Sequence, residues 1–214
     1  MTLVQIADFA RADHLAVLGA FHTDAEDAAL GLGTLILLGP DEPGFWHYVT
    51  AQTEFTDSTP NPLDRWSHRT ITALARRLGG TPYFPFGTPV RPFITWALRS
   101  GRAWVSPAQL LVHDTAGLFV SYRGAILVPG ELDLPPPPPK PCESCATKPC
   151  LTACPADALT ANGYDLPACH AFLETKDGKT CMTQGCAVRR ACPLARTYPR
   201  VDAQSAYHMA QFHK

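Results

Sequence analysis

The sequence predicts an α+β protein made of a larger N-terminal domain and a small cysteine-rich module. Three observations lead to this prediction. Helix-like and strand-like segments are mixed up to about residue 134, five prolines follow in a row, and all eight cysteines come after them. With 214 residues, of which 46% are hydrophobic, the chain can form one medium core plus a small module. We therefore expect a domain over residues 1–134, a polyproline spacer over 135–141 and a module over 142–214.

The first elements are predicted from short apolar runs and their flanking turns. Residues 3–12 are expected to form a short helix with Leu3, Ile6 and Phe9 on one face. The runs Leu15–Leu18 and Thr34–Leu38 are typical of buried strands, and Gly39-Pro40 should end the second one. A helix is expected to follow from Phe45 to Thr53.

Residues 61–78 are predicted to form an amphipathic helix. Pro62 suits its first turn, an apolar stripe runs along one face, and Gly79-Gly80 should stop it. Four arginines on the same segment have two interpretations, a contact for a phosphate or flavin and a solvated helix face; they are Arg65, Arg69, Arg76 and Arg77. The solvated face is the simpler interpretation.

The last part of the N-terminal domain is predicted to be a helix followed by a meander of strands. The helix is expected over residues 90–100. Three strands are expected over Gln109–His113, Leu118–Tyr122 and Ala125–Val128, with glycine-containing turns between them. Seven residues from Pro135 to Pro141 should then form an extended polyproline II spacer of about 20 Å.

Overall composition excludes several classes of function. The formal net charge is −1, so nothing in the total charge points to nucleic acid or to an anionic membrane. The longest strongly apolar run, Leu35–Leu38, is far shorter than the roughly 20 residues of a membrane helix. No secretory signal is visible at the N-terminus. We therefore expect a cytoplasmic protein in which clustered cysteines bind metal and do not form disulfides.

The eight cysteines form two groups of four, and each group ends in Cys-Pro. The first group has the spacing C-x2-C-x4-C-x3-C-P and the second C-x11-C-x4-C-x5-C-P. In ferredoxins with two [4Fe–4S] clusters, the cysteine before proline binds the cluster of the other group. The spacing therefore predicts one cluster on Cys142, Cys145, Cys150 and Cys192, and a second on Cys154, Cys169, Cys181 and Cys186.

Two alternatives for the cysteines stay open. Eight thiolates can bind two zinc ions, although zinc sites usually contain two tight C-x2–4-C pairs and only Cys142 and Cys145 form one here. A single cluster is the other alternative. Residues 135–214 also carry 9 Lys and Arg against 6 Asp and Glu. The cations near the later cysteines either compensate buried negative charge or form a solvated docking face; they are Lys176, Lys179, Arg189 and Arg190.

Two segments resemble known families. Leu111–Gly130 resembles cytosolic cobalamin-processing proteins of the CblC type, which implies a nitroreductase-like (flavin-reductase-like) α+β fold that handles cobalamin. Residues 168–174, Gly185-Cys186 and Cys192-Pro193 resemble epoxyqueuosine reductase, which joins a related cobalamin-binding domain to a dicluster ferredoxin-like module. The proton-donating aspartate of that reductase has no counterpart in Phe84–Pro89, so epoxyqueuosine reduction is not expected.

The first resemblance also implies roles for two residues in cofactor binding. Arg123 stands at the family's arginine before glycine, and His113 at its histidine beside the glycine-rich turn. Each has a simpler interpretation, since Arg123 can cap a surface turn and His113 can be a hydrogen-bonded strand histidine. His170, next to Cys169, is either a neighbour of a cluster ligand or a solvent-facing residue.

Two functions remain as hypotheses. In the first, the chain passes electrons through two [4Fe–4S] clusters to a cobalamin, which implies reduction of the cobalt or removal of its upper ligand. In the second, the chain is a ferredoxin-type electron carrier without a substrate site of its own. Either function needs a redox partner protein of the flavodoxin or ferredoxin reductase type, and neither involves nucleic acid or a membrane.

Overall fold

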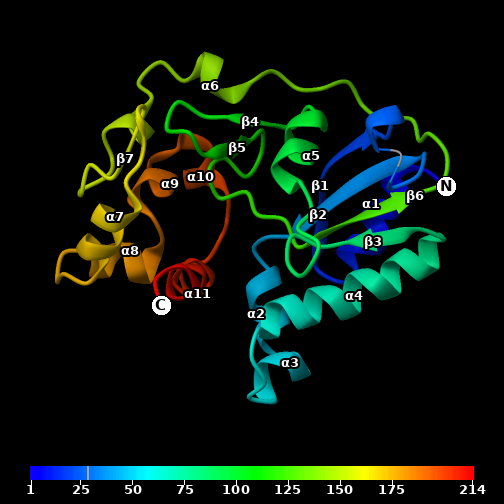
Figure 1. Ribbon diagram of the computed structural model, residues 1–214, viewed down its shortest axis with the longest axis horizontal. Coiled ribbons are helices and arrows are strands. Elements are labelled where there is room, and N and C mark those ends of the chain that lie inside the picture. The colour runs from blue at the N-terminus through cyan, green and yellow to red at the C-terminus, as the bar shows by residue number, and fades with distance from the viewer. Residues whose placement is uncertain (28) are drawn as a thin grey trace. The chain divides into compact units, whose positions relative to one another are not determined.

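The computed structural model describes residues 1–27 and 29–214 and has the mixed α+β architecture that the sequence predicts. The chain forms two compact units, and each contains two separate stretches of sequence. The first unit comprises Met1–Arg102 and Ser121–Pro138, and the second comprises Ala103–Val120 and Pro139–Lys214. Figure 1 traces the elements of both units by colour along the chain.

The first unit is built on a four-stranded antiparallel sheet with the strand order β1-β2-β6-β3. Its strands are β1 (Leu15–His22), β2 (Thr34–Pro40), β3 (Thr81–Tyr83) and β6 (Gly124–Val128). Every residue of β2 and β6 is buried, which is why both segments read as unbroken apolar runs. The strand β3 lies at an edge of the sheet, the position where a strand tolerates a proline such as Pro82.

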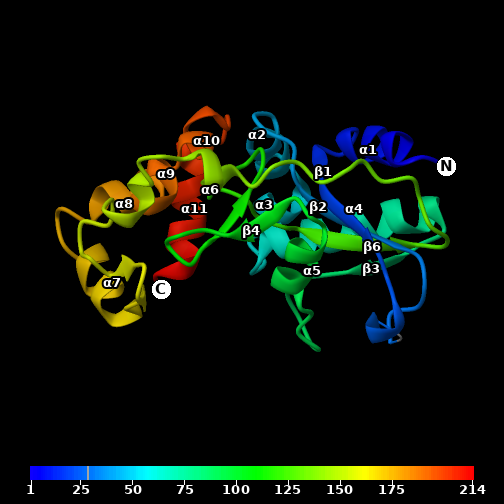
Figure 2. The same cartoon turned by 90° about the horizontal axis from the view of Figure 1, so that it is seen from above.

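Within the described part of this unit, five α-helices accompany the sheet. They are α1 (Leu3–Arg11), α2 (Phe45–Thr50), α3 (Thr53–Thr56), α4 (Pro62–Leu78) and α5 (Phe93–Arg99), and a 3-10 turn covers Ala25–Asp27. The helix α4 begins with Pro62 in its first turn and ends at Gly79, whose φ of 66° lies in the left-handed region. The helix packs against β6 and β3 (Figure 1 and Figure 2), and Ile71 of its buried stripe lies beside Gly124 of β6.

The second unit contains short elements joined by loops. Two small hairpins pair β4 (Ala103–Val105) with β5 (Leu111–His113), and β7 (Leu159–Thr160) with β8 (Gly163–Tyr164). Its helices are α6 (Pro141–Ser144), a 3-10 turn at Pro149–Leu151, α7 (Leu166–Leu173), α8 (Lys179–Gln184), α9 (Ala187–Ala191), α10 (Pro193–Thr197) and α11 (Asp202–Phe212). The longest of them, α11, packs against α8, and the two helices lie side by side in Figure 2.

Four predicted features differ from the structure. Gly39-Pro40 does not end the second strand, because β2 continues through both residues, which pair with Ala16 and Leu15 of β1. The helix expected over Phe45–Thr53 is two short helices, α2 and α3. The three-stranded meander expected between residues 109 and 128 does not form, because β5 pairs with β4 in the second unit and β6 joins the sheet of the first. Leu118–Tyr122, the middle strand of that meander, is not a strand, since this stretch carries the chain from one unit to the other.

The two units also differ from the domain boundaries expected from the sequence. Residues 103–120 belong with the cysteines, not with the N-terminal domain that was expected to span 1–134. The reason is apolar packing: Val112 and Leu118 form one core with Val188, Cys150 and Cys192. The change of unit near residue 138 falls inside the polyproline segment 135–141, which has no regular secondary structure before α6 begins. Pro137 in that segment lies against Gly101 of its own unit.

None of the helices in the described ranges, 1–27 and 29–214, is both long enough and apolar enough to cross a membrane.

Candidate metal centre

The first and last cysteines of the sequence contribute to one site in the second unit. Cys142 lies on α6, Cys145 directly follows that helix, Cys150 lies on the 3-10 turn, and Cys192 stands between α9 and α10. All four line one cavity of about 340 Å³, together with the apolar side chains of residues 112 and 118. We call these four residues the first cysteine set.

The thiols of the first cysteine set lie close enough together to affect each other's ionisation. Burial raises the pKa of Cys142, and negative charge on Cys150, Cys192 and Cys145 raises it further. Burial also raises the pKa of Cys150, followed by the effects of Cys192 and Cys145. Four neighbouring thiolates are therefore unfavourable here unless a positively charged centre compensates them, which is what a bound metal does.

The other four cysteines form a second cysteine set in the same unit: Cys154, Cys169, Cys181 and Cys186. Burial raises the pKa of Cys169, and the charges of Cys186, Cys154 and Cys181 add to that effect. Cys169 lies on α7, Cys181 is buried on α8, and Cys186 is the residue before α9. The two sets have the same members as the two ligand groups expected from the Cys-Pro pattern.

The donors and the space suit an iron–sulfur cube. Each set consists of four cysteines, which is the usual ligand set of a [4Fe–4S] cluster, and the first set surrounds a cavity walled by apolar groups. Within residues 1–27 and 29–214, no three His, Cys, Asp or Glu side chains are close enough to hold one metal ion. That finding concerns a single ion, whereas a four-iron cube holds its four thiolates farther apart.

A tyrosine contacts the second cysteine set. Tyr164 ends β8, and its hydroxyl donates a hydrogen bond to Sγ of Cys169 at 3.3 Å. Burial raises the pKa of this phenol, and the contact with Cys169 raises it further, so the hydroxyl keeps its proton and remains a donor. The sequence interpretation missed Tyr164, although its position five residues before a cysteine ligand was a usable signal.

The cations near the later cysteines divide into two kinds. Arg189 is partly buried and donates to the backbone carbonyl of Leu118. Burial lowers its pKa, and the nearby Cys186 and Tyr164 oppose that change. Lys176 and Lys179 are exposed. Arg190 is also partly buried, and its Nε donates to the carbonyl of Gly185 at 3.0 Å. The burial of Arg189 near Cys186 is compatible with charge compensation, whereas the exposure of the two lysines fits a solvated face.

The two residues expected to bind a cofactor lie in different units. His113 is fully buried on β5, and its Nδ1 accepts hydrogen bonds from the backbone N–H groups of Thr115 and Ala116, at 3.1 and 3.3 Å. Arg123 belongs to the first unit, where its Nη1 lies 3.5 Å from a carboxylate oxygen of Asp64. Its Nε donates to the carbonyl of Tyr122. The described contacts of both side chains are with neighbouring protein groups.

His170 is half-buried, and none of the described hydrogen bonds joins its ring to a cysteine. Its ring stacks on Phe212 with centroids 4.7 Å apart, and its Nδ1 lies 2.6 Å from Nδ1 of His213. Phe212 in turn stacks on Tyr164 at 6.4 Å. These contacts attach the end of α11 to the segment that carries Cys169.

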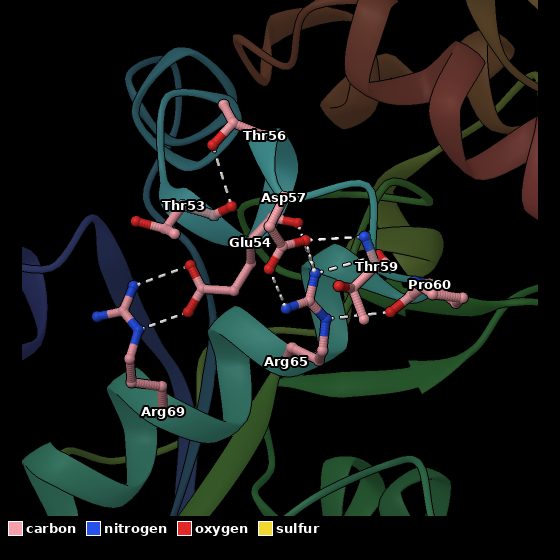
Figure 3. Close-up of polar contacts among 8 residues, drawn as sticks. All are labelled: Thr53, Glu54, Thr56, Asp57, Thr59, Pro60, Arg65 and Arg69. Atoms are coloured by element: carbon pink, nitrogen blue, oxygen red, sulfur yellow. Dashed lines mark hydrogen bonds and ion pairs between the residues drawn. The ribbon is translucent and has the colours of Figure 1, made fainter.

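Two of the four arginines on α4 bind protein carboxylates. Figure 3 shows Arg65 in a two-pronged contact with Asp57, with both distances 2.7 Å. Arg69 pairs in the same way with Glu54 (Figure 3). Arg77 stacks over the ring of Phe9 at 3.7 Å. These contacts favour a structural role for the arginines over a phosphate or flavin site.

Comparisons with models of protein families, with curated proteins and with solved structures found no match to this chain. The assignment of function therefore depends on the two cysteine sets and their surroundings.

Proposed function

We propose that this protein carries two [4Fe–4S] clusters and transfers single electrons. One observation supports the proposal most strongly: eight cysteines, confined to residues 142–192, fold into two sets of four that interleave along the sequence. Interleaved ligation is characteristic of ferredoxins with two clusters, because the cysteine before proline serves the neighbouring cluster. The second unit is accordingly proposed to be a dicluster ferredoxin-like module.

The chain supplies ligands, exclusion of water and charge compensation. When bound, the clusters supply one-electron redox chemistry. The two cysteine sets would hold them through thiolates, while Val112, Leu118 and Val188 keep water from the first set. The guanidinium of Arg189, beside Cys186, offsets part of the negative charge of the second set.

We further propose a corrinoid as the electron acceptor and a nitroreductase-like fold for the first unit. Both proposals rest on the resemblance of Leu111–Gly130 to CblC-type proteins and on the antiparallel sheet of the first unit. Of the resembling segment, residues 121–130 lie in the first unit and residues 111–120 in the second. A cytoplasmic redox protein of the flavodoxin or ferredoxin reductase type would supply the electrons. If no corrinoid binds, the proposed function reduces to that of an electron carrier.

Metal and sulfide analysis of anaerobically purified protein tests the cluster proposal. Two clusters require about eight iron atoms and eight sulfides per chain, with a broad visible absorption that dithionite bleaches. Half these amounts would indicate one cluster. Zinc in place of iron, without sulfide, would overturn the proposal.

A further inference from the structure

A polar side chain of α11, the helix that packs against α8 and its Cys181, has no hydrogen-bond partner among the described residues. Gln204 is fully buried, and neither its amide nitrogen nor its amide oxygen has a hydrogen-bond partner among the described residues. A buried amide without a partner lowers the stability of a protein, so such a group calls for an explanation. A group that the protein chain does not itself supply, such as a water, an ion or a cofactor, is one such explanation.

The surroundings of Gln204 point to the second cysteine set. Its helix packs against α8, which carries the buried Cys181. The next residue, Ser205, lies against Gly185, where an added Cβ would be 3.0 Å from the Cβ of Ser205. Gly185 directly precedes Cys186. The buried side of α11 therefore faces the segment that carries two cysteines of the second set.

Tyr164 approaches the same set from the β7–β8 hairpin. Its hydroxyl donates to Cys169, and its ring is held in place by stacking on Phe212 at an interplanar angle of 13°. Asp165, the next residue, caps α7 by accepting a hydrogen bond from the backbone N–H of Ala168 at 2.9 Å. Tyr164 therefore directly precedes the N-cap of α7, and Cys169 lies on that helix.

The first cysteine set has a different environment. Its described donors are backbone N–H groups, those of Cys150 and Ala108 at the Cys150 thiol. The cation near Cys142 is Lys148, whose side chain is exposed, so solvent and salt weaken its effect. The second set instead has the hydroxyl of Tyr164, a residue that is 42% exposed, and the partly buried guanidinium of Arg189.

We propose that Tyr164 and Gln204 are positioning donors that hydrogen-bond to sulfur atoms of the second cluster, so that this cluster has the higher reduction potential. The inference rests on the proposed function. Reduction adds one electron and therefore one negative charge to a cluster, and hydrogen bonds to its sulfurs stabilise that charge. When a one-electron donor such as titanium(III) citrate supplies a single electron per chain, we expect reduction of the cluster that Cys154, Cys169, Cys181 and Cys186 would hold.

An anaerobic redox titration of the full chain, followed by electron paramagnetic resonance, tests this proposal. Wild type should show two one-electron waves. Tyr164→Phe and Gln204→Leu should each move the higher wave to lower potential and leave the lower wave in place. The expected size is about a tenfold change in the ratio of reduced to oxidised cluster, which is about 59 mV for a one-electron couple.

Two matched variants serve as controls. Tyr83→Phe removes a hydroxyl that donates to a backbone carbonyl at the same distance, 3.3 Å, in the first unit. Gln211→Leu removes an exposed amide from α11, the helix that carries Gln204. Neither control should move either wave.

Iron and sulfide are counted in every sample before titration, so that the two proposals can fail separately. Wild type without clusters would overturn both. Clusters at full content, with no shift in Tyr164→Phe or with movement of the lower wave, would overturn this inference and leave the proposed function intact. If Gln204→Leu loses iron, the conservative Tyr164→Phe variant decides the result alone.

Discussion

Cys142 and Cys192, the first and last cysteines of the chain, line the same cavity. Interleaved ligation predicts this pairing of distant cysteines, whereas a sequential arrangement would place each group of four on its own cluster. The distinction can be tested with double variants, because two losses in one set damage one cluster and two losses in different sets damage both.

We expect Cys145→Ala with Cys192→Ala to retain about four iron atoms per chain, because both residues belong to the first set. The variant with both Cys145→Ala and Cys154→Ala should lose both clusters, although these two residues belong to the same group of four in the sequence. Iron and sulfide analysis of anaerobic samples measures the difference. The reverse order of iron content would establish sequential ligation.

Leu118 connects the segment 103–120 to the cysteines. It is 1% exposed and packs in the core that contains Cys150 and Cys192. Leu118→Ala should therefore cost about 2–5 kcal/mol of stability and speed the loss of iron to a chelator. The control is Leu166→Ala in the same unit, where the side chain is 44% exposed. Equal rates of iron loss in the two variants would contradict the packing described for the second unit.

Arg69 stabilises a carboxylate that is largely buried. Glu54 is 8% exposed and pairs with Arg69, whose hydrogen bond lowers the pKa of Glu54. Arg69→Ala leaves this carboxylate without its partner and should lower the free energy of unfolding by about 1–3 kcal/mol. The measurement is denaturation followed by tryptophan fluorescence in a Trp104→Phe background, because the other three tryptophans all lie in the first unit.

The matched control for this variant is Arg76→Ala, which removes an exposed arginine from the same helix. Its effect on the unfolding free energy should be within about 0.5 kcal/mol. A loss equal to that of Arg69→Ala would mean that helix propensity, and not the ion pair, determines the result.

Asp57 is expected to make the stability of the first unit depend on pH. Hydrogen bonds from Arg65, followed by one from the backbone of Thr59, lower its pKa from 3.8 to about 2. A carboxyl whose pKa is lower in the folded protein stabilises it above the unfolded value, so this contribution is present above about pH 4 and lost toward pH 2. Asp57→Asn should flatten the dependence of unfolding on pH in this window, measured by the same fluorescence.

The control for the acid dependence is Asp8→Asn, which breaks an exposed ion pair with Arg11 three residues along α1. Its pH profile should follow wild type. An Asp57→Asn profile that is parallel to wild type between pH 4 and pH 2 would rule out this carboxyl as the source of the dependence.

A corrinoid titration tests the proposed acceptor. If the resemblance to CblC-type proteins holds, hydroxocobalamin should bind with a change in its visible spectrum, and Arg123→Ala should weaken binding about tenfold, as expected for the loss of one charged hydrogen bond. Arg102→Ala, which alters another arginine of the same unit, is the comparison variant. No binding by wild type at tens of micromolar would remove the corrinoid from the proposal and leave the clusters untouched.

Local sequence patterns predicted many of the helices and strands. They did not predict which distant segments of the chain pair or pack together. The helix α4 was predictable because Pro62, an apolar stripe and Gly79 all indicate the same element. The two Cys-Pro steps predict the same two groups of cysteines that influence each other's ionisation, while the binding of clusters by these groups stays a prediction. The strand β3 was missed because it has only three residues and contains Pro82, which is acceptable only because that strand lies at a sheet edge.

The membership of residues 103–120 could not be derived from the sequence. Their alternating apolar residues fit a meander equally well, and the choice depends on Val112 and Leu118 packing against residues far along the chain. Gln204 was equally hidden, since a glutamine on a helix is usually exposed and only its burial marks it.

Because each unit is built from two separate stretches of the chain, neither a simple gene fusion nor a single proteolytic cut can join or separate the units cleanly. The backbone passes between the units three times, near residues 102, 120 and 138. Fusion of a complete ferredoxin domain to the end of an existing domain would create only one connection between them. A protease that cuts within the prolines would leave residues 103–120 covalently attached to the first unit at both ends. The fragment that follows the cut would therefore lack part of the core of the second unit.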